Sequence, residues 1–147
     1  MEIFRKGFFQ IHRIAQRYYN AKSEDGLTAQ EAHALRVISY RQTTTQQLLA
    51  DRLGIDKSQV TRLVKKLEAE GYLTRTTNPE DRREKLISST PKADAVKEQV
   101  IALTERFYEW LLSEMSQEEQ AALGQTFERL LTRARQARKN GFAELED

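Results

Sequence analysis

The segment from Asp56 to Leu73, DKSQVTRLVKKLEAEGYL, repeats its apolar residues with the period of an α-helix. Four of them stand at i, i+3, i+4 and i+7 and share the face that such a helix would bury: Val60, Leu63, Val64 and Leu67. The residues that point away from this face are polar or cationic: Ser58, Thr61, Arg62 and Lys65. The segment therefore predicts an amphipathic helix with a hydrogen-bonding, positively charged outer face.

Both ends of this predicted helix carry sequence signals. Asp56 is an N-cap residue with Gln59 three positions later, the spacing at which two side chains satisfy unpaired amides of a first turn. Gly71 supplies the left-handed residue that commonly ends a helix. Upstream, residues 44–53 predict a shorter helix, and Gly54 permits the positive φ of a tight turn. Two helices joined by so short a turn are typical of a helix-turn-helix.

A β-hairpin is predicted directly after the second helix. Tyr72–Thr76 and Lys85–Ser89 are short and rich in strand-forming residues, and the intervening TNPEDRRE contains the turn formers Asn78 and Pro79. Two helices, a strand, a charged tip and a second strand together predict a winged helix-turn-helix. The predicted fold class is mainly α with a small β-hairpin wing.

Helix-turn-helix geometry places the N-terminal part of the second helix against base edges in the major groove of B-DNA. The candidate major-groove residues are Ser58, Gln59, Thr61 and Arg62, and the candidate phosphate contacts are Lys57 and Lys65. In the wing, a carboxylate next to two arginines can hold a guanidinium in one orientation before it enters the narrow minor groove. The wing candidates are Asp81, Arg82 and Arg83.

Each of these features also has an ordinary explanation. A basic helix face is usually a solvated surface, and a charged hairpin tip is usually only a turn in water. Their succession within one compact segment favours nucleic-acid binding. The main alternative is a winged helix that contacts an acidic protein and never a duplex.

The chain resembles the multiple-antibiotic-resistance-regulator (MarR) family of bacterial transcription factors over nearly its whole length. The resemblance rests on QQLLADRLGIDKSQVTRLVKKLEAEGYLTR, residues 46–75, and on NPEDRREKLISSTPKA, residues 78–93. It implies a homodimer whose recognition helices enter successive major grooves, with Arg83 at the position of the minor-groove arginine and Asp81 bracing it. One departure is the run STPKA, residues 89–93, at the end of the second strand, where family members often have Leu-Thr and then Gly. The resemblance further implies release by a small aromatic or phenolic effector, whose pocket residues the sequence does not identify.

The rest of the chain is predicted to be helical, over residues 3–22, 28–41, 91–113 and 116–139. We expect a single domain over residues 1–147, with a DNA-binding lobe at 28–90. The apolar stripes of the terminal segments look too long for one small chain to bury, so residues 1–22 and 91–139 are interpreted as a helical dimerisation layer. Residues 140–147 are expected to form a flexible tail.

Composition narrows the classes of function. The 24 Lys and Arg residues nearly balance the 22 Asp and Glu residues, so attraction for a polyanion must come from local clusters such as Arg5–Lys22 and Arg129–Lys139. The sequence has no Cys, which excludes disulfides, thiol-based sensing and cysteine-ligated zinc. No apolar run approaches the length of a membrane span, and we expect a cytoplasmic protein.

An enzyme is not predicted. His12 and His33 stand in no metal, nucleophile or phosphate-binding motif, so no catalytic residue, metal site or cofactor is assigned. The predicted function is sequence-specific binding of double-stranded DNA by a homodimer on an inverted repeat, most simply as a repressor. RNA is a less suitable partner because its A-form major groove is too narrow and deep for a reading helix.

Overall fold

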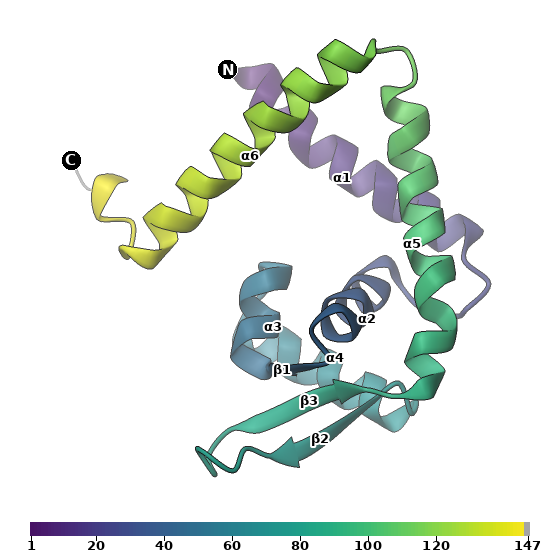
Figure 1. Ribbon diagram of the computed structural model, residues 1–147, viewed down its shortest axis with the longest axis vertical. Coiled ribbons are helices and arrows are strands. Elements are labelled where there is room, and N and C mark those ends of the chain that lie inside the picture. Colours follow the sequence, from purple (N-terminus) through teal and green to yellow (C-terminus); the bar gives the residue numbers. More distant parts are fainter. Residues whose placement is uncertain (146–147) are drawn as a thin grey trace. The chain divides into compact units, whose positions relative to one another are not determined.

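A computed structural model describes residues 1–145 and contains two compact units, Met1–Tyr108 and a second one that begins at Glu109 (Figure 1). The elements of the first unit are α1 (Glu2–Lys22), α2 (Ala29–Arg41), β1 (Thr43–Thr45), α3 (Gln46–Leu53), α4 (Lys57–Ala69), β2 (Leu73–Thr77), β3 (Lys85–Ser89) and most of α5 (Pro91–Leu112). The predicted fold class is confirmed, because helices dominate and the strands form one small antiparallel sheet.

The core of the first unit lies where α2, α3 and α4 pack with the sheet. Its largest fully buried side chains are Leu35, Ile38, Leu49, Val60, Val64, Leu67, Leu73 and Ile87. Complete burial of such a side chain contributes roughly 1.5–3 kcal/mol to stability. The predicted inward face of the second helix is thus correct, since Val60, Val64 and Leu67 are at most 1% exposed. With this face fixed in the core, the opposite face of α4 must meet solvent.

The sheet has three strands in the order β1-β3-β2, one more than the sequence predicted. The helix expected from Thr44 begins only at Gln46, because Thr43–Thr45 pairs with β3 and places Thr44 opposite Ile87. Three consecutive β-branched threonines suit an extended strand better than a helix. Thr45 then becomes the N-cap of α3 by accepting a hydrogen bond from the Leu48 amide.

The hairpin itself is close to the prediction. β2 and β3 pair from Leu73 with Ser89 to Thr77 with Lys85, so the first strand begins one residue later than expected. The two strands project as a ribbon, with the charged tip at its far end (Figure 1).

The N-terminal helix buries little of its apolar stripe within one chain. Phe4, Phe8 and Ile14 are each more than half exposed, whereas Tyr19 near the end of α1 is buried in the core. The rest of the first unit therefore does not bury this stripe. Such an exposed run of large apolar side chains is characteristic of an interaction surface.

The second unit contains the last turn of α5, α6 (Gln117–Lys139) and a short 3₁₀ turn, Ala143–Leu145. Ser116 and Glu119 form the capping box at the start of α6. None of the residues of α6, all of which the structure describes, is buried, and Phe127, Leu130 and Leu131 are 40–46% exposed. The predicted flexible tail at 140–147 falls partly outside the described residues. Across residues 1–145, no helix combines the length and the apolar character that crossing a membrane requires.

Candidate nucleic-acid interface

The start of α4 is held by a complete capping box. The Asp56 carboxylate accepts hydrogen bonds from the Gln59 amide and from the Ser58 hydroxyl, both at 2.8 Å. The Gln59 side-chain oxygen accepts in return from the Asp56 amide at 3.2 Å. The amide of Gln59 and the hydroxyl of Ser58 stabilise the carboxylate and lower the pKa of Asp56. The predicted cap is confirmed, and it fixes the orientation of two candidate reading residues.

Most candidate residues on α4 are exposed on one face. Lys57, Ser58, Gln59, Arg62 and Lys65 all belong to the solvent-facing side of the helix. This face therefore offers three cations, the Gln59 NH₂ donor and the acceptor lone pairs of the Ser58 hydroxyl, whereas the Ser58 proton and the Gln59 oxygen are used in the cap.

Thr61 differs from the other candidates on α4. It is only partly exposed, its hydroxyl donates to the Lys57 carbonyl at 2.7 Å, and the Gln46 amide donates to that hydroxyl at 2.6 Å. Because Gln46 lies at the start of α3, this contact ties the two helices of the helix-turn-helix together. The sequence did not indicate this contact, since 15 residues separate its partners.

The turn between the two helices depends on Gly54. Its φ of 65° lies in the left-handed region that glycine adopts without strain, and it forms the C-cap of α3. The chain can therefore reverse within Gly54–Asp56 before α4 begins.

The wing tip places Asp81 and Arg83 together as the sequence predicted. The Asp81 carboxylate accepts from the Arg83 backbone amide at 3.0 Å and from the guanidinium at 3.2 and 3.4 Å. These contacts, the backbone one first, lower the pKa of Asp81. The Arg83 side chain nevertheless remains 92% exposed, so it is oriented but still accessible. Arg82 is also exposed, and the Asp81 carboxylate holds Arg83 rather than the adjacent Arg82.

The base of the wing is joined to α4 by an ion pair that the sequence analysis missed. The Arg75 guanidinium on β2 donates twice to the Glu68 carboxylate on α4, with Nε and Nη2 at 3.0 and 2.5 Å. The hydrogen bonds from Arg75 lower the pKa of Glu68. The sequence does contain a signal for this ion pair, because a helix that bears Glu68 is followed by a strand that bears Arg75. The pairing itself depends on the angle at which the strand leaves the helix, which the sequence does not give.

A groove of about 690 Å³ separates the wing from the N-terminal ends of α3 and α4. Its polar lining includes Gln46, Gln47, Lys57, Arg83 and Lys85. Lys57 at the start of α4 and the braced Arg83 of the wing thus line one groove, together with the carboxylates of Asp56, Asp81 and Glu84.

These features define a winged helix-turn-helix protein. A family model described as MarR family matches residues 25–84, which include the helix-turn-helix and the wing tip. Within these residues the chain is similar to the MarR family, and a solved structure of a MarR regulator shares its fold over most of the chain.

Among the similar proteins is the HTH-type transcriptional regulator SarZ of Staphylococcus saprophyticus, 30% identical over 95 residues, or 65% of each chain. The chain thus spans slightly less than two thirds of that relative. A solved structure of a MarR transcriptional regulator from Methanosarcina mazei has a TM-score of 0.85 at 25% identity and covers 92% of this chain and 99% of the other. A mutant MarR from Escherichia coli, solved in complex with operator DNA, has a TM-score of 0.77 at 24% identity over 89% and 94% of the two chains, which shows a shared fold.

Proposed function

We propose that the protein is a transcriptional regulator that binds double-stranded DNA sequence-specifically. The observation that carries this proposal is the exposed, capped outer face of α4, whose first residue, Lys57, lines the same groove as a wing arginine already oriented by Asp81. A helix that enters a major groove and an arginine that enters the neighbouring minor groove need this combination of exposure and preorganisation. The match of residues 25–84 to the MarR family model and the similarity to a MarR structure solved with operator DNA support the same function.

The proposed contacts are of two kinds, those that recognise base edges and those that bind the phosphate backbone. Ser58, Gln59 and Arg62 meet base edges, and Thr61 contributes at the border of this face without its hydroxyl, which Gln46 already occupies. Lys57 and Lys65 bind phosphates and fix the register of the helix. In the wing, Arg83 enters the minor groove, Asp81 orients it, and Arg82 adds positive charge beside the backbone.

The working form is proposed to be a homodimer built through the apolar faces of the terminal helices. The large apolar side chains that stay exposed on α1 and on α6 support this proposal, because such surfaces are characteristic of protein interfaces. A two-fold dimer presents two copies of α4 about 34–36 Å apart, which matches the half-sites of an inverted repeat. Occupation of such an operator would block transcription, so the proposed role is that of a repressor in the cytoplasm.

Release by a small aromatic or phenolic effector is proposed from the family relationship alone. Such an effector can act only if it binds the DNA-competent and the incompetent states of the dimer with different affinity.

Selection of bound duplexes from a random pool tests the proposed function. We expect one enriched motif with inverted-repeat symmetry. Contacts to base edges would select the motif, and the two-fold axis of the dimer would make it an inverted repeat. Recovery of no preferred sequence, together with salt-sensitive binding to every duplex, would contradict the proposal and favour a winged helix that contacts acidic proteins. Analytical ultracentrifugation at micromolar concentration checks the dimer separately, and a monomer would contradict that part.

A further inference from the structure

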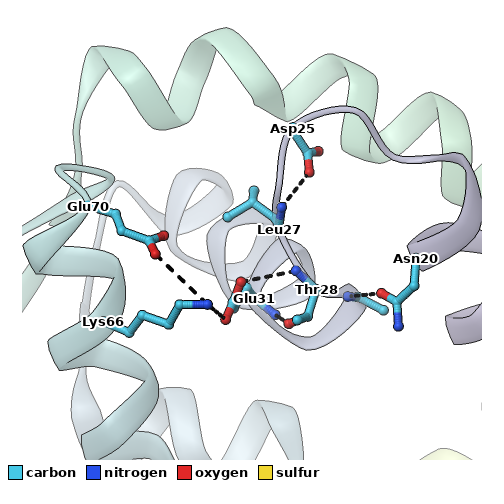
Figure 2. A network of polar contacts seen from close by, with 8 residues as sticks. Asn20, Asp25, Leu27, Thr28, Glu31, Lys66 and Glu70 are labelled. Atoms are coloured by element: carbon cyan, nitrogen blue, oxygen red, sulfur yellow. Dashed lines mark hydrogen bonds and ion pairs between the residues drawn. The ribbon is translucent and has the colours of Figure 1, made fainter.

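The N-terminus of α2 is a polar junction at which α1 and α4 both attach (Figure 2). The amide groups there have four side-chain acceptors: Asp25 for Leu27, Glu31 for Thr28, Asn20 for Ala29 and Thr28 for Glu31. The Asn20 acceptor comes from the last turns of α1, and its contact with the Ala29 amide measures 2.8 Å. The first turn of α2 is thereby fixed to the end of the N-terminal helix.

Glu31 belongs to this junction and also reaches α4. One oxygen of its carboxylate accepts the Thr28 amide at 3.0 Å, which completes the capping box, and the other accepts the ammonium group of Lys66. The side chain of Glu31 is only 7% exposed, although a capping box needs no burial. The capping role alone therefore does not explain why this carboxylate is buried. Its second oxygen makes a contact across 35 residues of sequence, to the helix that carries the proposed reading face.

Lys66 is oriented differently from the neighbouring lysine on α4. Lys65 lies on the exposed face, whereas the ammonium group of Lys66 extends back to Glu31, and Glu70 lies farther from it at 3.9 Å. The hydrogen bond to Glu31 is the main reason why the pKa of Lys66 is raised. A buried carboxylate is unfavourable without its cation, so the pair resists separation of α4 from the start of α2.

We infer that Glu31 is a positioning residue for DNA recognition. Through its contact with Lys66 it sets the orientation of α4 relative to the junction between α1 and α2. The inference rests on the proposed function of α4. Directional hydrogen bonds to base edges weaken steeply when donor and acceptor are misaligned, whereas attraction to phosphates depends much less on orientation. Loss of the Glu31 contact should therefore reduce discrimination between sequences more than it reduces binding to DNA in general.

Glu31→Gln separates positioning from electrostatics because the two predict opposite signs. The amide oxygen of the new side chain can still accept the Thr28 amide. The net charge rises by one per protomer, because a carboxylate is removed. Electrostatics alone would strengthen binding to every duplex. Loss of positioning would instead lower the ratio of operator affinity to random-duplex affinity by roughly fivefold to 100-fold, the scale of one lost base contact.

Glu70→Gln is the matched control. It makes the same change of charge beside the same lysine, but Glu70 is exposed and only at the edge of ion-pair distance. We expect its affinity ratio to stay within about twofold of the wild type, because surface pairs contribute little.

A second variant guards against poor folding of Glu31→Gln. Lys66→Gln removes the half-exposed partner, and electrostatics alone would then weaken operator and random duplex by the same factor. Positioning predicts a larger loss on the operator, and Lys66→Arg, which keeps the charge and can still donate to Glu31, should restore the ratio.

Both affinities are measured for all variants at one salt concentration with the selected operator and a scrambled duplex, after urea unfolding has shown that each variant is folded. If the wild type does not prefer its selected duplex, the proposed function fails first. If the wild type does prefer it and the Glu31 and Lys66 variants keep the ratio of the Glu70→Gln control, only the positioning role of Glu31 is refuted. A lower stability with an unchanged ratio would refute it as well.

Discussion

The tie between α3 and α4 can be tested by replacing Thr61 with Val. This substitution keeps the shape of the side chain and removes only the hydroxyl that accepts from Gln46 and donates to the Lys57 carbonyl. A neutral hydrogen bond contributes about 0.5–1.5 kcal/mol net. The contact with the Lys57 carbonyl adds little, because such a bond within one helix does not stabilise it. We expect the free energy of unfolding to fall by ~1 kcal/mol, which corresponds to roughly 2–4 °C in Tm for a chain of this size.

Urea unfolding at one fixed protomer concentration measures this change, since the stability of a dimer depends on concentration. Thr126→Val is the matched control, because the exposed Thr126 hydroxyl donates to the Ala122 carbonyl within α6, at 2.9 Å. Its effect should stay within about 0.5 kcal/mol. A double-mutant cycle of Thr61→Val with Gln46→Ala should give a coupling energy of ~1 kcal/mol.

The result that refutes this reasoning has two parts. Zero coupling with Gln46, and a Thr61→Val variant as stable as the Thr126→Val control, would mean that the hydroxyl is not held between the helices. Loss of discrimination at a single operator base pair in Thr61→Val would show that the hydroxyl reads DNA. If the tie exists, the order of base preferences should stay the same at every position.

Three further perturbations address the reading face, the core and the base of the wing. Arg62→Ala should lose about 1–3 kcal/mol of operator affinity and relax preference at one position, while Lys65→Ala should weaken all duplexes alike and reduce the salt slope by about 1, both measured by binding titrations over a salt series. Leu67→Ala removes a fully buried side chain and should cost about 2–5 kcal/mol in urea unfolding, whereas a loss under 1 kcal/mol would mean that the site is not tightly packed. Arg75 lowers the pKa of Glu68 below its ordinary 4.5, so the pair stabilises the folded state above that pH and the benefit disappears as the pH falls through the lowered value. The urea midpoints of the wild type and Glu68→Gln should therefore differ at pH 7 and converge in acid, and a difference that persists at pH 2 would contradict this cause.

The features that the sequence predicted correctly are those set by near neighbours in the chain. The capping box at Asp56, the left-handed glycines and the buried face of α4 each depend on residues within one or two helical turns. The bracing of an arginine by Asp81 is local too, since Arg83 stands only two positions later, and the family resemblance indicates Arg83 rather than Arg82. Local chemistry therefore identified both parts of the candidate site, the helix and the wing tip.

The features that the sequence did not predict depend on how separate elements meet. The sequence predicts a helix from Thr44, because three threonines are too few to show alternation, and only pairing with β3 makes Thr43–Thr45 a strand. The contacts between Gln46 and Thr61 and between Glu31 and Lys66 join different helices, so no spacing in the sequence reports them. Glu31 illustrates the difficulty, since its spacing from Thr28 matches a capping box, whereas nothing in the sequence indicates its second contact, with Lys66.

The cap at the start of α4 also limits how this helix can meet DNA. An uncapped helix N-terminus is a good phosphate site because its free amides and its dipole both attract an anion. Here the Asp56 carboxylate, which is ionised at neutral pH, occupies that position, and the Gln59 amide and the Ser58 hydroxyl lower its pKa further. A phosphate is therefore excluded from the helix end, so anchoring must come from side-chain cations such as Lys57 and Lys65. Because the net charge is only +2, those few cations should account for most of the salt dependence of binding.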